Sequence, residues 1–251
     1  MTPVVLLLVV IVGLVVGSFL NVCIARIPAA ESLWRPRSRC PACRTPISSR
    51  DNIPLVSYVL LGGRCRACGC RIPLQYPLVE AGTSALFVGS YWRFGLGADL
   101  PVALVLGSAL VVLTAIDLKH QILPDVITLP GIAAGFLANV VTGRVSWLES
   151  LIGIFVGGGT FFVIIFLSKG GMGGGDMKLG AMLGAFLGWK VILAALLIAV
   201  LAGGIVAIVL LVTGARSRKD PVPFGPFLAA GGLAGFFWGE RLLEWYLDTF
   251  R

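Results

Sequence analysis

The sequence predicts an all-α polytopic membrane protein with about eight transmembrane helices and a small cytoplasmic domain, rich in cysteine, inserted after the first helix. The 251 residues are 57% hydrophobic and only 13% charged, and their mean hydropathy is +0.96. Soluble domains have about half apolar and about a quarter charged residues. The composition therefore excludes an ordinary soluble enzyme and indicates a chain that crosses the bilayer repeatedly.

Eight apolar runs have about the length needed to cross roughly 30 Å of hydrocarbon. They fall near residues 4–25, 77–92, 100–116, 126–142, 151–168, 177–189, 191–213 and 226–240. The boundary at Trp189-Lys190 is the least marked of them. No basic residue precedes the first run and Arg26 follows it, so this run is interpreted as a retained helix whose N-terminus lies outside.

Basic residues support this orientation. With this orientation the segments expected in the cytoplasm are 26–76, 117–125, 169–178 and 214–225. Together these segments contain 15 of the 20 Lys and Arg residues. Such a bias is typical of cytoplasmic loops. It also accounts for the net charge of +8 without a nucleic-acid partner, since basic patches that bind nucleic acid usually lie on soluble modules. The predicted partner of these loops is the lipid bilayer.

The segment 26–76 differs from the rest, with nine Arg and five of the six Cys. Two C-x2-C pairs, Cys40–Cys43 and Cys65–Cys68, are separated by 21 residues. Four thiolates at this spacing can surround a tetrahedral Zn²⁺, which predicts a structural zinc knuckle with no open position for a catalytic water. Disulfides or a redox role are alternatives, although disulfides are disfavoured for a loop that lies in the reducing cytoplasm. Cys70 is interpreted as a spare thiol that could compete as a ligand, and Cys23 as a packing residue.

Asp176 is the first candidate functional residue. It follows the glycine-rich stretch Gly170-Gly171-Met172-Gly173-Gly174-Gly175, between two apolar runs. An acid at membrane depth usually marks function, and glycines allow a substrate backbone to approach closely. The alternative is an N-cap for the sixth span.

Asp117 ends the third span, which places it at the same cytoplasmic face as Asp176. Two carboxylates within hydrogen-bonding reach share a proton, and such a pair can activate water against a peptide carbonyl. Because Asp176 opens a helix and Asp117 closes one, helix dipoles favour Asp176 as the initial base and Asp117 as the acid. The alternatives are a solvated helix end, a transporter or channel that binds cations or relays protons, and a structural scaffold.

Two further polar residues lie near this face. Asp125 follows Pro124 and begins the fourth apolar run, so we interpret it as an N-cap, with a role in orienting substrate left open. The lone His120 is interpreted as interfacial. Glu80 lies within the second run, where it could form an interhelical hydrogen bond or ion pair.

Several motifs in order resemble one family. They are Gly17-Ser18-Phe19-Leu20-Asn21-Val22 with Arg26 and Pro28, the two cysteine pairs, Asp51-Asn52-Ile53-Pro54-Leu55, Tyr76-Pro77-Leu78-Val79-Glu80, Ile116-Asp117, Leu123-Pro124-Asp125 and Gly173-Gly174-Gly175-Asp176-Met177-Lys178-Leu179. Over nearly its whole length the chain resembles the bacterial type IV prepilin peptidases, which are GxGD aspartic proteases with a second, N-methyltransferase activity.

The resemblance implies that Asp117 and Asp176 are catalytic. We assign Gly173, Gly175, Asp125 and Lys178 a supporting role in the catalytic loop. The family cleaves the short basic leader of prepilins and pseudopilins at the cytoplasmic face of the inner membrane, and then methylates the new N-terminus with S-adenosylmethionine.

From the apolar runs and the shift in composition we expect three parts: a first transmembrane helix (1–25), a cytoplasmic zinc-binding domain (26–76) and a transmembrane peptidase domain (77–251). The resemblance associates the domain 26–76 with the methyltransferase activity. The sequence has no G-x-G-x-x-G nucleotide site, so the residues that bind the methyl donor are not identified. The segment 26–76, together with Glu80, is where we expect them.

Overall fold

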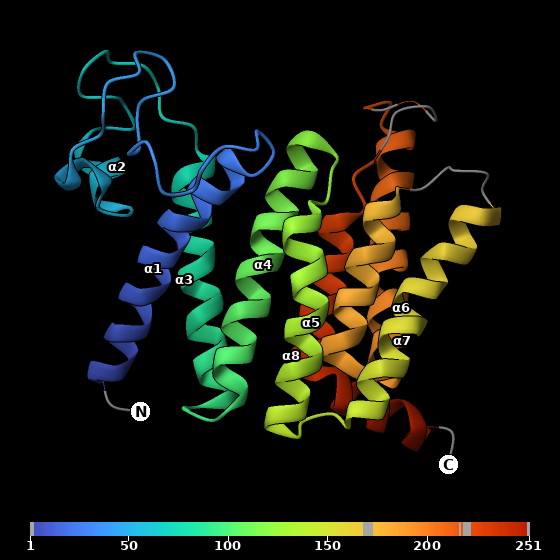
Figure 1. Cartoon of the computed structure of the whole chain (residues 1–251). Coiled ribbons are helices and arrows are strands. Elements are labelled where there is room, and N and C mark those ends of the chain that lie inside the picture. The colour runs from blue at the N-terminus through green and yellow to red at the C-terminus, as the bar shows by residue number, and fades with distance from the viewer. Residues whose placement is uncertain (1–2, 168–172, 216, 218–221, 250–251) are drawn as a thin grey trace. The chain divides into compact units, whose positions relative to one another are not determined.

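The computed structural model describes residues 3–167, 173–215, 217 and 222–249. Its helices are α1 Pro3–Arg26, the short 3-10 helix η1 Ser49–Asn52, α2 Val56–Leu60, α3 Gln75–Phe94, α4 Asp99–His120, α5 Asp125–Thr142, α6 Trp147–Leu167, α7 Gly174–Val212 and α8 Gly225–Thr249 (Figure 1). In this described part of the chain β-structure is limited to two isolated bridges, Arg39–Pro46 and Arg64–Arg71. The predicted all-α class is confirmed.

Five of the described helices are long and apolar enough to cross a membrane: α1, α4, α5, α6 and α7. The runs expected at 77–92 and 226–240 do form helices, α3 and α8, but these are less apolar. In α3 the apolar pattern is diluted by Glu80 and by buried hydroxyl residues such as Thr83 and Ser90. The expected number of eight spans is therefore not established by helix length and composition.

Helix α7 contains the boundary that the sequence marks least. It extends over 39 residues, but Gly188 has φ 73° and ψ 169°, so two helical segments meet at this residue. The side chains of Asn139 and Ser150 each donate a hydrogen bond of 2.7 Å to the carbonyl of Ala185, just before the kink. Carbonyls at the end of a helical segment need such outside donors. The break predicted at Trp189-Lys190 thus lies one residue earlier, at a glycine.

The chain forms two compact units, residues 1–100 and 101–251. In the first unit α1 and α3 pack side by side (Figure 1). A Cβ atom at Gly13 would lie 2.6 Å from Ser84 Cα, and one at Gly17 would lie 2.7 Å from Glu80 Cα. Small residues four apart let membrane helices approach in this way. The segment 26–76 belongs to this unit, and the domain boundaries at residues 25 and 76 stay a prediction.

In the second unit α7 packs against α5, α6 and α8. Its contact with α6 is backbone against backbone: Gly153 meets Gly184, and Gly157 meets Gly180, with no room for a Cβ atom on any of these four. On the other side Gly231 of α8 packs on the backbone of α7. These glycines fix the distances from α7 to α6 and α8, and the N-terminal ends of α7 and α8 contribute to the site described below.

The contact between α6 and α7 predicts different effects on stability for alanine substitutions at Gly157 and Gly159. Gly157→Ala places a methyl group against the backbone of Gly180 and should destabilise the protein by about 1–3 kcal/mol. Gly159→Ala, on the same helix but in open space, should be neutral or slightly stabilising, because alanine favours the helix. Thermal unfolding of the purified protein in detergent measures both. Equal stability of the two variants would contradict this packing.

Candidate active site and metal centre

Asp117 lies in the last turn of α4 and is buried, with 5% of its surface exposed. Its Oδ2 accepts a hydrogen bond of 2.9 Å from the backbone N–H of Gly225, the first residue of α8. A Cβ atom on residue 225 would lie 2.7 Å from the same oxygen, so only glycine fits there. The carboxylate is therefore held at the positive, N-terminal end of α8.

Asp176 is the third residue of α7 and is half-buried. The helix is capped by Gly173, whose carbonyl accepts the Asp176 N–H at 3.2 Å, while the Asp176 carboxylate accepts the Gly173 N–H. This reciprocal pattern resembles a capping box, so the alternative that Asp176 is itself the N-cap is wrong. The charge of Asp117 acts on Asp176, which places the two acids within electrostatic reach of each other.

The glycines before Asp176 differ in their surroundings. A Cβ atom on Gly175 would lie 2.9 Å from Leu123 Cβ, in the loop between α4 and α5. At Gly174 a Cβ atom would meet nothing within 4 Å, and Gly173 is almost as open. Gly175 therefore lets the end of α4 approach the start of α7, whereas its two neighbours leave exposed backbone beside Asp176. The remainder of the glycine-rich stretch, Gly170, Gly171 and Met172, lies outside the described residues.

Asp125 forms an ion pair instead of a cap. The N-cap of α5 is Pro124, with no side-chain capping bond, so the interpretation of Asp125 as an N-cap is wrong. Lys178 Nζ donates to both carboxylate oxygens of Asp125, at 2.6 and 2.7 Å. This pair joins the first residue of α5 to the first turns of α7, two residues after Asp176. The lone His120 is exposed at the end of α4, as expected for an interfacial residue.

These contacts gather the predicted residues at one end of the second unit, where α4 ends and α5, α7 and α8 begin (Figure 1). Asp117, Asp176, Asp125, Lys178 and both predicted glycines are there. The sequence interpretation missed Gly225, whose only signal is a glycine-proline pair that opens an apolar run. Asp117 closes α4, as predicted, but its carboxylate also lies at the N-terminus of α8, so the dipoles of these two helices act on it in opposite senses. The assignment of Asp176 as the initial base and Asp117 as the acid stays a prediction.

The second cluster lies in the first unit. The Sγ atoms of Cys40, Cys43, Cys65 and Cys68 all lie within 4.8 Å of one another. Four sulfurs bound to one Zn²⁺ at about 2.3 Å would be about 3.8 Å apart, so the arrangement fits a tetrahedral metal ion. A hydrogen bond from the backbone N–H of Cys43 is the main cause that lowers the pKa of the Cys40 thiol. All six cysteines are free, and Cys70 Sγ lies 3.5 Å from Cys40 Sγ.

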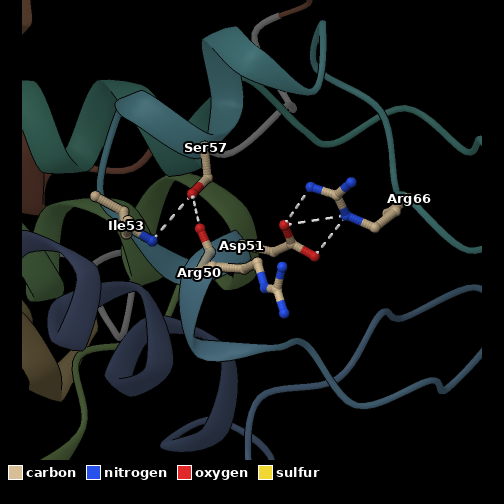
Figure 2. Close-up of polar contacts among 5 residues, drawn as sticks. All are labelled: Arg50, Asp51, Ile53, Ser57 and Arg66. Atoms are coloured by element: carbon tan, nitrogen blue, oxygen red, sulfur yellow. Dashed lines mark hydrogen bonds and ion pairs between the residues drawn. The ribbon is translucent and has the colours of Figure 1, made fainter.

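Polar contacts tie the second cysteine pair to the segment before α2. Figure 2 shows Arg66, which lies between Cys65 and Cys68, donating to Asp51 from Nε at 2.9 Å and from a terminal nitrogen at 2.7 Å. This bond lowers the pKa of Asp51. Ser57 Oγ donates to the Arg50 carbonyl at 2.9 Å and accepts the Ile53 N–H at 3.0 Å. These contacts link the second cysteine pair to residues 50–57.

Residues 11–94 match the family model of the bacterial peptidase A24 N-terminal domain, and residues 104–208 match that of the type IV leader peptidase family. The chain belongs to the type IV leader peptidase family. It is 38% identical to a prepilin leader peptidase/N-methyltransferase of Aeromonas hydrophila, over 97% of this chain and 94% of that protein. For the proteins of the same name from Pseudomonas aeruginosa and Bacillus subtilis the identities are 36% (95% and 92% covered) and 35% (94% and 96% covered).

The resemblance inferred from the motifs is thereby confirmed. The match to the A24 N-terminal domain lies within the first unit and contains the cysteine cluster, while the match to leader peptidases lies within the second unit and contains Asp117 and Asp176. No solved structure matches the chain significantly.

The contact between Leu123 and Gly175 predicts different consequences for adjacent glycines of this leader-peptidase unit. Gly175→Ala should lower stability by about 1–3 kcal/mol, because the new methyl group overlaps Leu123 and pushes the two helix ends apart. Gly174→Ala is the matched control, one residue earlier and in open space, and should not lower it. Thermal unfolding monitored by circular dichroism compares them. An unchanged Gly175→Ala protein would refute the close approach.

Proposed function

We propose that the protein is an intramembrane aspartic endopeptidase that removes the short basic leader of prepilins or pseudopilins and then methylates the new N-terminus. It acts as a multi-pass protein of the bacterial inner membrane, with the end that holds the two acids facing the cytoplasm. One observation carries the proposal. A chain of the type IV leader peptidase family brings two carboxylates, Asp117 of α4 and Asp176 of α7, within electrostatic reach at one end of a helical unit.

The two acids share one proton, because like charges at close range do not both ionise easily. The ionised carboxylate takes a proton from water as the water oxygen bonds to the carbonyl carbon of the scissile peptide. The protonated carboxyl group gives its proton to the carbonyl oxygen. The tetrahedral intermediate is then a gem-diol. When it collapses, the carbon–nitrogen bond breaks and the leaving nitrogen takes the proton that the first carboxylate had gained from water. The second carboxylate takes a proton from a diol hydroxyl as the carbonyl of the new acid forms, so the dyad again holds one proton.

The residues around the dyad have positioning roles in this proposal. The Gly225 N–H fixes one oxygen of Asp117 and leaves the other to act on the substrate. The Lys178–Asp125 pair holds α7 against α5 beside Asp176. Gly173 and Gly174 expose backbone with free space around it, which suits an extended peptide next to the dyad. Which acid starts ionised is set by substrate and water as well as by the helix ends.

A transporter or channel fits the geometry less well. Ion sites of secondary transporters usually lie near the bilayer midplane, at broken helices. Here the break in α7 at Gly188 is twelve residues from Asp176, and the acids lie where helices begin and end. The family membership also favours hydrolysis.

Single replacements test the dyad. Asp117→Asn and Asp176→Asn should each lower kcat/KM for leader cleavage by about 10²- to 10⁴-fold or more, because each removes one partner of the proton exchange. Asp99→Asn changes a carboxylate at the opposite end of α4 and serves as the control. Mass spectrometry of a prepilin peptide, before and after incubation with the purified enzyme, reports the cut. An Asp117→Asn enzyme with wild-type activity would remove Asp117 from the dyad.

The cysteine cluster is proposed to hold one structural Zn²⁺, with Cys40, Cys43, Cys65 and Cys68 as ligands. With four sulfurs bound the ion has no position for a reacting group, so its role is to order a segment with little core of its own. S-adenosylmethionine, the proposed donor, supplies an electrophilic methyl group when bound. The new N-terminal amine is the group that must reach it in neutral form.

Metal content distinguishes the ligands from the neighbouring thiols. Purified protein should contain about one zinc per chain by elemental mass spectrometry. Cys68→Ser should lose most of it, whereas Cys70→Ser and Cys23→Ser should retain it. The reverse result, loss with Cys70→Ser and retention with Cys68→Ser, would make Cys70 the fourth ligand.

A further inference from the structure

A cavity of about 930 Å³ lies inside the first unit. Three cysteines of the segment 26–76 line it, Cys40, Cys65 and Cys70, and so do residues from the end of α1 and the start of α3, among them Asn21 and Glu80. Its volume is in the range of sites for small molecules and cofactors. The catalytic dyad belongs to the other unit, so the peptidase chemistry does not account for this cavity.

Glu80 is a buried acid on the wall of this cavity, with 8% of its surface exposed. Its Oε2 accepts the Leu55 N–H at 2.9 Å, and Ser18 of α1 also bonds to the carboxylate. An interhelical hydrogen bond was one of the roles the sequence suggested. No cation pairs with Glu80 among the ion pairs of the described residues, although buried carboxylates usually have one.

Asn21 provides a second acceptor on the same wall. It is 3% exposed, and its Nδ2 donates to the carbonyls of Tyr76 at 3.0 Å and Gly17 at 3.4 Å. Its Oδ1 is buried and has no hydrogen-bond partner in the structure. A buried acceptor left without a donor destabilises a fold, so a ligand that brings donors would be favoured here.

We propose that this cavity is an ammonium-binding site, in which Glu80 and the Asn21 Oδ1 accept hydrogen bonds from a primary ammonium group. The inference rests on the proposed methyltransferase function, because that reaction involves two such groups. One is the α-ammonium of the methyl donor, and the other is the new N-terminus of the cleaved peptide. A carboxylate opposite the cation and an uncharged acceptor beside it are the partners such a group needs.

The charged residues that line the cavity favour the methyl donor, and not the peptide N-terminus, as the molecule whose ammonium group binds there. Arg39, Arg44, Arg50 and Arg71 also line the cavity. Guanidinium groups bind carboxylates, and the amino-acid end of S-adenosylmethionine carries a carboxylate next to its ammonium group. We therefore expect Glu80 and Asn21 to bind the ammonium of the donor and the arginines to face its carboxylate.

Glu80→Gln tests the site with little change in shape, because a glutamine oxygen still accepts the Leu55 N–H while the charge is lost. Affinity is measured by titrating the zinc-loaded full-length protein with S-adenosylhomocysteine in detergent. Loss of a buried charged hydrogen bond should weaken binding by about ten- to a hundredfold. Binding of 5′-methylthioadenosine, which lacks the amino-acid end, should not change. Glu244→Gln, which neutralises an exposed acid of α8 in the other unit, is the control and should bind normally.

The possible results distinguish the methyl donor from the peptide N-terminus as the bound group, and they distinguish failure of this inference from failure of the proposed function. Normal binding of S-adenosylhomocysteine by Glu80→Gln, with a raised KM for methylation of a pre-cleaved peptide, would assign the site to the peptide N-terminus. If Glu80→Gln changes neither the affinity for S-adenosylhomocysteine nor the KM for methylation, while zinc content and leader cleavage are normal, the inference is overturned and the proposed function stands. A wild-type protein that cleaves leaders but neither binds S-adenosylhomocysteine nor methylates would overturn this site and the methyltransferase half of the function together.

Discussion

The hydrogen bond from the Gly225 N–H to Asp117 sets the geometry on which the second unit depends. A buried carboxylate at a helix end needs donors, and α8 supplies one from its first residue, at a position where any side chain would displace the acid. Helix α8 is in turn held against α7 by a close backbone contact at Gly231, and α7 begins with Asp176 in its first turn. The relative placement of the two acids is therefore a consequence of how closely these helices pack.

Close packing in this chain is achieved by glycines in register. Apolar side chains gain little from packing against one another in lipid, so helices associate through van der Waals contact and short-range polar bonds. The pairs between α6 and α7 bring backbones together, and Asn139 and Ser150 bond to the α7 carbonyl exposed by the kink at Gly188. In the first unit Gly13 and Gly17 do the same for α1 and α3, which places Asn21 and Glu80 on facing helices beside the cysteine cluster.

The sequence predicted the parts whose signal is local. The apolar run 126–142 corresponds to α5, the cysteine spacing predicted the sulfur cluster, and ordered motifs predicted the family. The sequence did not predict the contacts between distant residues. The residues next to Asp125 in the sequence predict a helix cap, but its actual partner, Lys178, is 53 residues away. Likewise, no residue near Asp117 in the sequence indicates that the Gly225 N–H is its hydrogen-bond donor. The unsatisfied Asn21 oxygen is likewise visible only once α1 and α3 are packed together.

The central claim is that two carboxylates share one proton in the active enzyme, and its most direct test is the pH dependence of leader cleavage. The measurement is kcat/KM across the stable pH range, with a leader peptide that contains no histidine or acidic side chain. A shared proton predicts a bell-shaped profile with two apparent pKa values that belong to the pair, because activity falls when both acids are protonated and again when both are ionised. If kcat/KM falls on only one side of the pH range and stays constant up to the limit of stability on the other side, the shared-proton dyad is contradicted.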